Sequence, residues 1–513
     1  MKKIDKFKNF LKDYKYGIFI VILISLSVFI YNLTSNSFGI DTEEYLYYKD
    51  NYLNVWISIS RPFLVILKKF TLLNILNLKF TSFLTYLFFM AYLILLFYFY
   101  KDILKFKNDT NFKKNLRMIL FCSIISTSLI YVHHFYFLLQ SAEVAFMLII
   151  SLFSMKFIEE GIENKNIIYN ILGILLLSFC IGTYQSFTNV YIVMSVIYIF
   201  DIINNKPNIS TANIFKKIGI LILNLIIALI LYFCLYSLLS WYSNIEPANY
   251  LMEKIMWEKD SITTCIKSIL IGIRNTYFGI FVGQTHYYNY LNFISFVIIL
   301  MSIIKEIISK EKNIFKIIIM LCIILSPFSL TILLGSSASE LYRTKIALPI
   351  IIAFSCVFIG YNIIKNYKVY IVYTILLSIF IYYQIIISVR YIDSDQLRFQ
   401  QDVNFSTVLY NDLSKYNIKN KPLVILGYKE YNNVPYKGEV IGSSFFAFDR
   451  YYVVGVNQRS SHFMNLMGFP VIDCSIEDYN NALNYFNELN TYPNSGSIIE
   501  TENYVIVKIS DNL

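Results

Sequence analysis

The chain is poor in charged residues, glycine and proline. Only 15% of its 513 residues are charged, whereas a soluble domain carries about 25%. It contains 17 glycines and 9 prolines, and 57% of its residues are hydrophobic. This composition excludes an ordinary soluble enzyme, a disordered chain and a small disulfide-stapled module. The class that remains is a protein that crosses a membrane several times.

Cysteine and histidine are too few and too scattered to indicate a metal or redox site. None of the seven cysteines forms a C-x-x-C pair, and five fall in apolar runs, where a thiol behaves as a small hydrophobe. Of the four histidines, His133 and His134 are adjacent and the others are isolated, so no zinc-ligand spacing appears. We therefore expect neither a metal nor a cofactor.

Long apolar runs dominate what the chain does contain. A helix needs about 20 mostly apolar residues to cross a bilayer. The sequence predicts eleven such spans, several of them short. They cover residues 17–33, 81–100, 118–132, 136–156, 167–181, 187–204, 218–240, 291–304, 317–334, 345–364 and 369–388.

The distribution of Lys and Arg predicts how these spans are oriented. With the N-terminus inside, the short cytoplasmic segments hold 23 of the 44 basic residues, whereas the longer outer loops hold 11. This positive-inside pattern accounts for the net charge of +10 without a nucleic-acid partner. We therefore expect a cytoplasmic N-terminus and a C-terminal tail on the outer side.

The tail is long enough to form a small domain of its own. Its expected elements are a polar helix at 394–416, strands within 422–428, 451–456, 470–473 and 503–510, and a helix at 475–490. The predicted fold is an all-α polytopic membrane bundle over 1–388, followed by an extracytoplasmic α/β domain over 389–513. In the first outer loop, residues 53–70 predict an amphipathic helix at the membrane surface.

Charged side chains are nearly absent from the spans, with Glu143 as the main exception, and polar residues gather at the outer ends of the spans. If the helices form a bundle, these side chains converge on one face, where an outward-facing polar cleft is the default site. They are Asp41, Glu43, Glu44, Arg61, His133, His134, Gln140, Glu143, Tyr184, Gln185, Arg274, Gln284, His286, Glu340 and Arg343.

Asp41 and Glu43 are candidate general bases. Asp41 follows the first span closely. Lipid and protein at that height can raise the pKa of a carboxyl toward neutrality, so that it can take a proton from a hydroxyl. The alternative is structural, because Asp41 followed by Glu44 fits a capping box at a helix start.

Arg343 is a candidate ligand for a phosphate. It precedes the tenth span, close to Glu340 and Lys345. A guanidinium at the outer leaflet suits a lipid-linked phosphate, and Arg61, Arg274 and Lys345 are weaker candidates for the same role. The alternative is an interfacial arginine whose head group snorkels to water.

Three further polar residues have a functional and a structural interpretation. Tyr184 and Gln185 interrupt an apolar stretch, and the Gln185 amide can hydrogen-bond sugar hydroxyls from both of its ends. A turn between two helices would also need polar residues at this point. Glu143 is either a second acid or a buried hydrogen-bond partner of His133 or His134.

Four motifs in this order resemble those of a GT-C-like family, the polytopic bacterial glucosyltransferases of O-antigen modification and serotype conversion. FGIDTEEYL, with WISISRP behind it, resembles the family's first-loop motif. GTYQSF resembles its Tyr-Gln turn, and LYRTKIALP resembles its arginine before a late span. YPNSGSIIETENYVIVKIS resembles its closing pair of strands.

The resemblance implies transfer of a sugar, usually glucose, from a polyprenyl-phosphate donor to a hydroxyl of a surface glycan outside the bacterial cytoplasmic membrane. Asp41 matches the family's acidic base, with Glu43 as the alternative because this loop reads D-T-E-E. Arg343, with Arg61, would meet the charge of the phosphate, and no metal is implied. A lipid-linked glucose synthase and a flippase would be functional partners.

Two other functions fit parts of this pattern. A flippase or exporter of lipid-linked sugars explains the spans and the cleft. It explains neither the external tail nor the nearly charge-free midplane. An O-antigen polymerase or ligase would use a diphosphate-linked oligosaccharide, so assays with monophosphate and diphosphate donors separate it from the main hypothesis.

Overall fold

The computed structural model of the protein contains two compact units. Unit 1 comprises Met1–Leu33, Leu53–Phe135 and Gln140–Ser388, and unit 2 comprises Thr34–Tyr52, Tyr136–Leu139 and Val389–Leu513. Unit 2 is thus assembled from three segments that lie far apart in the sequence. The structure describes residues 2–48, 52–71, 77–103, 110–205, 209–246, 248, 250–283, 286, 289–309, 313–337, 341–364, 366–431 and 441–513.

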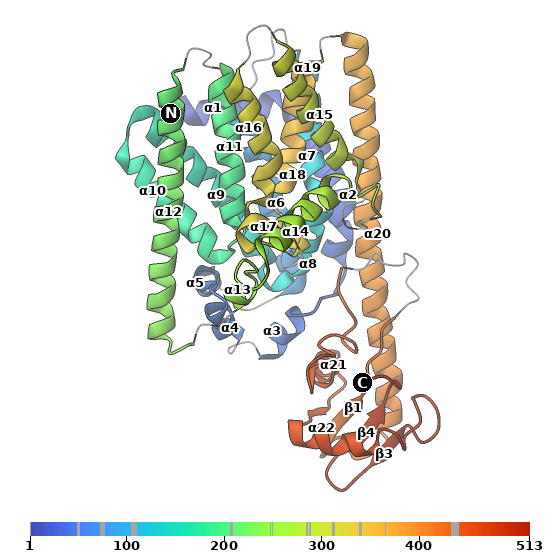
Figure 1. The fold of residues 1–513 in the computed structure, drawn as a ribbon. Helices are drawn as coiled ribbons and strands as arrows, with labels where there is room; N and C mark the ends of the chain where they lie inside the picture. The colour runs from blue at the N-terminus through green and yellow to red at the C-terminus, as the bar shows by residue number, and fades with distance from the viewer. Residues whose placement is uncertain are drawn as a thin grey trace. The chain divides into compact units, whose positions relative to one another are not determined.

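Unit 1 is built from helices throughout its described part (Figure 1). They are α1 (Lys2–Asp13), α2 (Lys15–Thr34), α4 (Tyr52–Ser58), α5 (Pro62–Thr71), α6 (Leu78–Tyr100), α7 (Asn111–Ser126), α8 (Leu129–Tyr136), α9 (Leu138–Asn164), α10 (Ile167–Thr183), α11 (Phe187–Asn205), α12 (Thr211–Tyr242), α13 (Tyr250–Glu253), α14 (Ile262–Tyr277), α15 (Tyr290–Ile308), α16 (Ile314–Leu325), α17 (Ser329–Leu334), α18 (Leu348–Ala353), α19 (Gly360–Ile363) and the first part of α20 (Tyr367–Leu413).

Eight helical stretches of the described chain are long and apolar enough to cross a membrane: α2, α6, α9, α11, α12, α15, α16 with α17, and α20. Together, α7 and α8 meet the same criterion, but they are bent by 47°. Shorter apolar stretches are α10 and Leu348–Ile363. Each of the eleven predicted spans coincides with one of these stretches. The chain is a multi-pass membrane protein, and the number of crossings stays a prediction.

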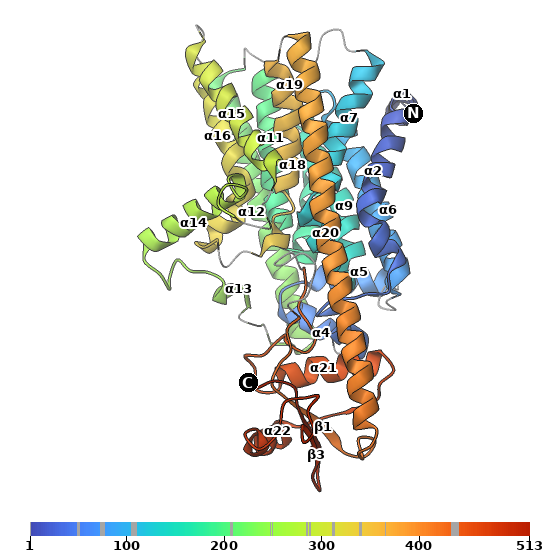
Figure 2. The same cartoon turned by 90° about the vertical axis from the view of Figure 1, so that its right-hand side faces the viewer.

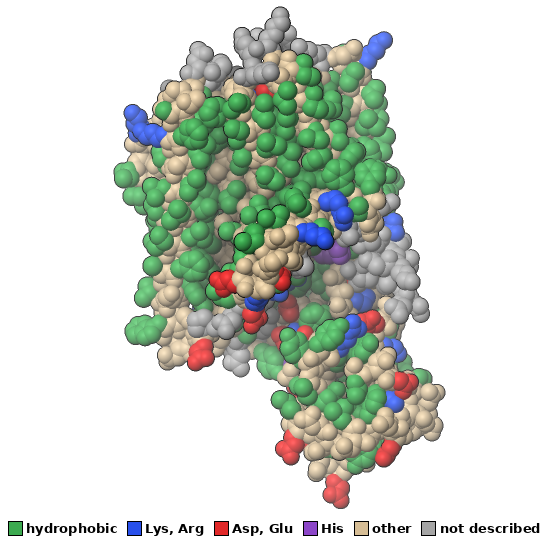
Figure 3. Space-filling view, in the orientation of Figure 1, with side chains coloured by type: hydrophobic (Ala, Val, Ile, Leu, Met, Phe, Trp, Pro, Cys, Tyr) green, Lys and Arg blue, Asp and Glu red, His purple; other side chains and the backbone are tan. Residues whose placement is uncertain are grey.

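The outward-facing side chains of unit 1 are those expected of a helix bundle in lipid. The most apolar of the eight stretches is α12, and it is also the least buried. Its Ile222 and Leu223 are 54% and 53% exposed. Hydrophobic side chains cover most of the surface in the upper part of the view in Figure 3, where few charged side chains appear. A water-soluble protein would not leave such a continuous apolar surface uncovered.

Side-chain caps explain where many helices begin. In each case an Asn, Ser or Thr in extended conformation accepts a hydrogen bond from a backbone N–H of the first turn, which would otherwise have no partner. The capping residues are Asn77, Thr110, Asn166, Ser210, Ser261, Asn289 and Asn313.

The predicted span 118–132 is broken in the structure. The Thr127 hydroxyl donates to the Ser123 carbonyl at 2.7 Å, and such side-chain bonds compete with the helical ladder. The Gln384 amide donates to the Ile124 carbonyl at 2.9 Å, and the Ser388 hydroxyl donates to the Thr127 carbonyl at 2.7 Å. Side chains of α20 thus satisfy carbonyls that the break would leave without partners, as a membrane interior requires.

One helix of the loop 241–290 crosses the direction of the long helices (Figure 2). This helix, α14, buries Cys265, Ile269, Gly272 and Thr276, which recur every three or four residues and form one face. The single buried face and the direction of α14 are those of a helix that lies across the bundle rather than along it.

Unit 2 contains α3 (Thr42–Tyr48), the rest of α20, and a four-stranded sheet. Its other elements are β1 (Pro422–Leu426), α21 (Gly455–Leu466), β2 (Ile472–Asp473), α22 (Ile476–Ala482), β3 (Ile498–Glu500) and β4 (Val505–Lys508). The strand order is β2-β1-β4-β3, with β1 parallel to both of its neighbours and β3 antiparallel to β4. The small C-terminal α/β arrangement is therefore confirmed in its mixed helix and strand content.

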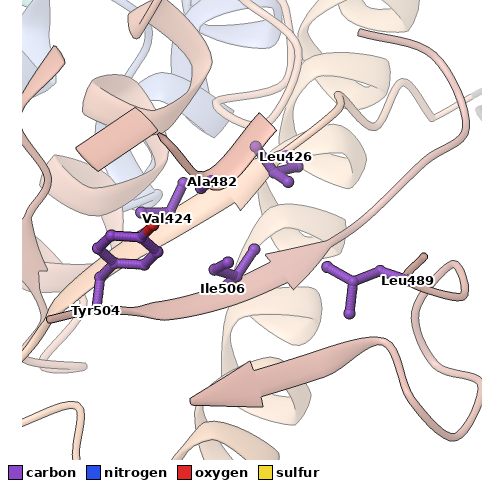
Figure 4. Packing of buried hydrophobic residues seen from close by; sticks show 6 residues of the cluster. All are labelled: Val424, Leu426, Ala482, Leu489, Tyr504 and Ile506. Atoms are coloured by element: carbon purple, nitrogen blue, oxygen red, sulfur yellow. The ribbon is translucent and has the colours of Figure 1, made fainter. Parts of the chain in front are cut away.

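The sheet and α22 enclose a small hydrophobic core (Figure 4). Alternate residues of β1, Val424 and Leu426, face Ile506 of β4, as the two-residue repeat of a strand requires. Tyr504, Ala482 and Leu489 complete the cluster.

One strand predicted for the tail does not form, and two predicted helices form with other bounds. The polar helix expected at 394–416 is the continuation of α20. The helix expected at 475–490 ends its regular turns at Ala482. The segment 451–456 is a turn that leads into α21, not a strand, and Tyr451 and Tyr452 are largely exposed. A Cβ at Gly455 would lie 2.2 Å from the Asp449 carbonyl oxygen, so this close turn overrides the strand propensity.

Replacing Ile506 with Ala should destabilise the sheet of unit 2. Ile506 is fully buried, and removing such a side chain costs about 2–5 kcal/mol. Hydrogen exchange of the β1 and β4 amides in the detergent-solubilised chain should therefore accelerate. The matched control is Ile472→Ala, since Ile472 is exposed on β2. Equal exchange in the two variants would contradict the assigned core.

Candidate functional site

Four carboxylates of unit 2 surround the guanidinium of Arg459. Its Nη1 lies 2.6 Å from Oε1 of Glu43 and 3.2 Å from Oε1 of Glu44. Its Nη2 lies 3.5 Å from Oδ1 of Asp41, and its Nε lies 2.8 Å from Oδ2 of Asp449. These five residues are called the Arg459 cluster below.

Unusual backbone conformations bring the cluster together. Asp41 has a φ of 71° just before α3 begins, and Asp449 has a φ of 60° shortly before α21. For a residue other than glycine this left-handed conformation costs on the order of 1–3 kcal/mol, and such residues concentrate at functional sites. Gly39, two residues before Asp41, passes so close to Tyr136 that a Cβ would lie 2.1 Å from the ring.

Burial and charge act in opposite directions on the cluster. Glu43 is fully buried, and burial raises its pKa to about 7 against the opposing effect of Arg459. Burial also raises the pKa of Glu44. For Arg459, burial acts to lower the pKa, but the carboxylates outweigh it and leave the pKa raised. One permanent cation therefore faces four carboxyls, of which Glu43 changes its protonation near neutral pH.

Exposure distinguishes Asp41 from Glu43. The Asp41 side chain is 35% exposed, whereas that of Glu43 is 0% exposed. A hydroxyl substrate can thus reach Asp41 more directly. The predicted capping box does not form, because Asp41 is left-handed rather than extended, and both Asp41 and Glu44 direct their carboxylates to Arg459.

His462 lies one turn after Arg459 on α21, and its side chain is buried. Its Nε2 lies 3.0 Å from the Tyr48 hydroxyl and 3.4 Å from Oδ2 of Asp473. Its ring stacks on that of Tyr47, with 4.1 Å between the centroids. No local sequence pattern singles out Arg459 or His462, because only the fold of unit 2 brings the tail to the segment that follows α2.

In unit 1, a turn between α4 and α5 positions Arg61. Ser60 is left-handed, with a φ of 66°. Its carbonyl accepts hydrogen bonds from the Gln185 amide and the Tyr232 hydroxyl, both at 2.8 Å. The Arg61 backbone N–H donates to the Trp56 carbonyl at 2.8 Å. The expected amphipathic helix over 53–70 is therefore two helices joined at this turn.

The guanidinium of Arg61 rests on an aromatic ring. Its carbon lies 4.9 Å from the centroid of Tyr184, and its Nη1 donates to Oε1 of Gln140 at 2.8 Å. Its Nε is buried without a hydrogen-bond partner among the described residues. Within that part of the chain, the partners of Arg61 are thus an amide and a ring rather than a carboxylate.

Histidines and a second arginine adjoin Arg61. His134 is fully buried, its ring lies 5.0 Å from that of Tyr184, and the charges of both Arg61 and Arg343 act on it. His133 is also within the electrostatic reach of Arg343. Unit 1 therefore gathers two guanidiniums around one buried histidine.

Tyr342 and His286 complete this region. The Tyr342 hydroxyl donates to the His286 carbonyl at 2.8 Å, and their rings stack at 5.3 Å. The ring of His133 meets that of Tyr342 edge-on at 4.9 Å. These contacts hold the segment that carries Arg343 next to α8.

Glu143 pairs with Lys68, which lies in the segment 53–70 expected to form an amphipathic helix at the membrane surface. Oε1 of Glu143 lies 2.5 Å from Nζ of Lys68, and the two side chains are 1% and 0% exposed. The Lys68 ammonium also lies 5.2 Å from the ring centroid of Trp56. A buried ion pair of this kind is costly to break, because the remaining charge would be left without compensation.

The predicted site residues thus fall into two groups. Unit 1 brings together Arg61, His133, Tyr184, Gln185 and Arg343, with Glu143 in its own ion pair. Unit 2 brings together Asp41 and Glu43. Glu340 lies outside the described residues, as does Gln284. Within the described ranges, no three His, Cys, Asp or Glu side chains are placed to share a metal ion.

The Glu43→Gln variant should alter how stability depends on pH. The Glu43 carboxyl has a pKa of about 7 in the fold, against 4.5 ordinarily. Because the folded-state pKa is raised, the contribution of Glu43 to the free energy of unfolding is fully present below pH 4.5 and is lost as the pH rises through about 7.

Between roughly pH 5 and pH 8, the unfolding midpoint of the wild type should therefore fall more than that of Glu43→Gln, as followed by circular dichroism. Glu502→Gln serves as the control, because Glu502 is an exposed carboxylate of the same unit. If the unfolding midpoint of Glu43→Gln fell with pH as steeply as that of the wild type, Glu43 would not titrate in this range.

Comparison with known proteins relates the chain to one family. Residues 30–360, more than half of the chain, match the family described as glucosyl transferase GtrII. The matched region contains Asp41, Glu43, Arg61, Tyr184 and Arg343. No curated protein and no solved structure gives a match. The chain belongs to the glucosyl transferase GtrII family of membrane proteins.

Proposed function

We propose that this glucosyltransferase moves glucose from a polyprenyl-phosphate donor to a hydroxyl of a surface glycan, on the outer side of the bacterial cytoplasmic membrane. The observation that carries the proposal is the placement of Asp41, a partly exposed carboxylate in a left-handed conformation within the Arg459 cluster. The family match supports the transferred group. The proposal places the enzyme among GT-C-type transferases.

In this reaction, Asp41 is the general base. Its carboxylate takes the proton of the acceptor hydroxyl as that oxygen attacks the anomeric carbon of glucose. The bond from that carbon to the donor phosphate breaks, and polyprenyl phosphate leaves. A single displacement of this kind inverts the anomeric configuration, through an oxocarbenium-like state similar to that of glycoside hydrolysis. Glu43 is the alternative base, but its full burial favours a role in holding Arg459.

Arg61 and Arg343 are the groups that meet the charge of the leaving phosphate. A guanidinium binds phosphate oxygens through two parallel hydrogen bonds. The Nε of Arg61, which is buried without a partner in the described chain, is one donor that such an oxygen would satisfy. Charge that develops on the leaving group is stabilised best by donors that are already in place.

Several of the other candidate residues act by positioning these groups. The Gln185 amide donates a hydrogen bond to the Ser60 carbonyl, and the ring of Tyr184 packs against the guanidinium of Arg61. Glu143 neutralises Lys68, and His133 packs against Tyr342 beside Arg343. Glu340 remains a proposed substrate ligand on its sequence position alone. The donor would come from a lipid-linked glucose synthase and reach the outer leaflet through a flippase.

Replacing Asp41 with Asn should lower kcat by about 10²- to 10⁴-fold, the usual contribution of a general base. The measurement is transfer of labelled glucose from polyprenyl-phosphate glucose to the surface glycan of a strain that lacks the gene. Glu44→Gln is the matched control, because it also removes one carboxylate that contacts Arg459. A full rate in Asp41→Asn, or a larger loss in Glu44→Gln, would reject Asp41 as the base.

Substitution of Arg61 or Arg343 by Ala should weaken use of the donor. A hydrogen bond to a charged group contributes about 1.5–3 kcal/mol, so we expect kcat/KM for the donor to fall roughly 10- to 100-fold. Lys at either position should restore only part of it, because it lacks the planar fork. Arg274→Ala is the control, since Arg274 is exposed and bonds its neighbour Asn275. Unchanged kinetics in both Ala variants would exclude the phosphate role.

A further inference from the structure

Unit 2 contains a cavity that the proposed chemistry does not use. Its volume is about 380 Å³, within the usual range of small-molecule sites, roughly 300–1,000 Å³. The segment 442–452 forms most of its wall, and Arg398, Glu430 and Tyr431 close it. All of these residues belong to unit 2.

The cavity shares two wall residues with the Arg459 cluster. Asp449 lines the cavity and also binds Nε of Arg459 at 2.8 Å. Phe448 lines the cavity, and its ring centroid lies 5.1 Å from the guanidinium of Arg459. A ligand in the cavity would therefore lie next to the carboxylates that include Asp41 and Glu43.

Aromatic side chains at the cavity are left open to solvent. Tyr451 is 86% exposed and Tyr452 is 71% exposed, and both line the cavity. A tyrosine offers an apolar ring face together with a hydroxyl that hydrogen-bonds. This combination matches a sugar ring, which has apolar C–H faces and a rim of hydroxyl groups.

The charged side chains that line the cavity are two cations, Arg398 and Arg450, and two anions, Glu430 and Asp449. Arg450 pairs with Glu430, its Nη2 lies 3.2 Å from the Tyr451 hydroxyl, and its guanidinium lies 4.9 Å from the ring of Tyr428. Asp449 is paired with Arg459. Such a lining offers many donors and acceptors but little net charge, which suits hydroxyl groups better than a phosphate.

One wall of the cavity is fixed in advance. Arg398 forms ion pairs with Asp395 at 3.1 Å and with Asp402 at 2.8 Å. Asp402 also accepts a hydrogen bond from the Ser444 hydroxyl at 2.6 Å, and Asp395 accepts one from the Gly442 N–H at 3.1 Å. This network connects the cavity wall to α20. Because the wall is already ordered, a ligand would lose little binding free energy to the ordering of these side chains.

We propose that this cavity binds the glycan acceptor, with Tyr451 and Tyr452 stacking on its sugar rings and the Arg450–Glu430 pair hydrogen-bonding its hydroxyls. The acceptor hydroxyl next to the bound stretch then lies at the side of the cavity where Phe448 and Asp449 adjoin the Arg459 cluster. This inference rests on the proposed function, whose acceptor it locates. A lipid surface fits the same tyrosines less well, because Glu430 and Asp449 would lie against its head groups.

Binding of acceptor without donor tests the proposal. The probe is a set of oligosaccharides made by partial hydrolysis of the surface polysaccharide from a strain that lacks the gene. The full-length protein is held in nanodiscs, and the Kd of the wild type is compared with those of Tyr452→Ala and Glu430→Gln. Val453→Ala is the matched control, because Val453 is 56% exposed in the same turn but does not line the cavity.

We expect the Kd to rise at least about tenfold in the two cavity variants, and to stay at the wild-type value in Val453→Ala. Hydrogen exchange in β1 and β4 should match the wild type, which would exclude unfolding of unit 2. Equal affinities in all four proteins, or no binding by the wild type, would overturn the proposal. Failure of glucose transfer with intact oligosaccharide binding would instead count against the proposed donor chemistry.

A tryptophan at position 452 distinguishes the lipid alternative. In Tyr452→Trp, the added fluorescence should change with the oligosaccharide and not with brominated lipids in the nanodisc. Quenching by the brominated lipids, with no response to the oligosaccharide, would assign these side chains to the membrane surface and overturn the proposal.

Discussion

The electrostatic balance around Arg459 holds the functional part of unit 2 together. One guanidinium contacts carboxylates from the segment after α2 and from the segment before α21, regions separated by about four hundred residues of sequence. Because Glu43 is fully buried, loss of the guanidinium would leave its carboxyl in a poorly solvated place without the ion pair that compensates its burial, which is more costly than losing a surface pair. The proposed base, its neighbours and the adjoining cavity therefore depend on one side chain.

Unit 1 also contains a buried cation, Lys68, and a half-buried one, Arg61, each with its own set of neighbouring side chains. Its buried ammonium, Lys68, is compensated directly by Glu143. Arg61 is held differently, since an amide, an aromatic ring and a backbone turn position a guanidinium whose charge the described residues leave without a carboxylate. In a low-dielectric environment such a cation is costly unless an anion is supplied from outside. This asymmetry between Lys68 and Arg61 is the physical reason to assign the donor phosphate to Arg61 rather than to Lys68.

The sequence was most informative where one physical rule acts over many residues. Hydropathy located every apolar helical stretch, and the runs at 422–428 and 503–510 are centred on β1 and β4. Prediction from the sequence failed where a single residue determines whether a helix or strand continues. Thr127 breaks a span, Gly455 turns an apparent strand into the start of a helix, and Ser60 divides an apparent amphipathic helix. Residue type selected Asp41, Arg61 and Arg343, but the partners Arg459 and Lys68 depend on tertiary contacts that no local pattern contains.

Three left-handed residues, Asp41, Ser60 and Asp449, lie at the turns that carry the proposed chemistry. Glycine adopts that conformation without the steric cost that a side chain brings. At Asp41 and Asp449 the chain therefore accepts this steric cost and keeps two carboxylates that contact Arg459. Glycine at these two positions would relieve the steric cost, but it would also remove two of the carboxylates that pair with Arg459, so local strain and the proposed chemistry cannot be separated there.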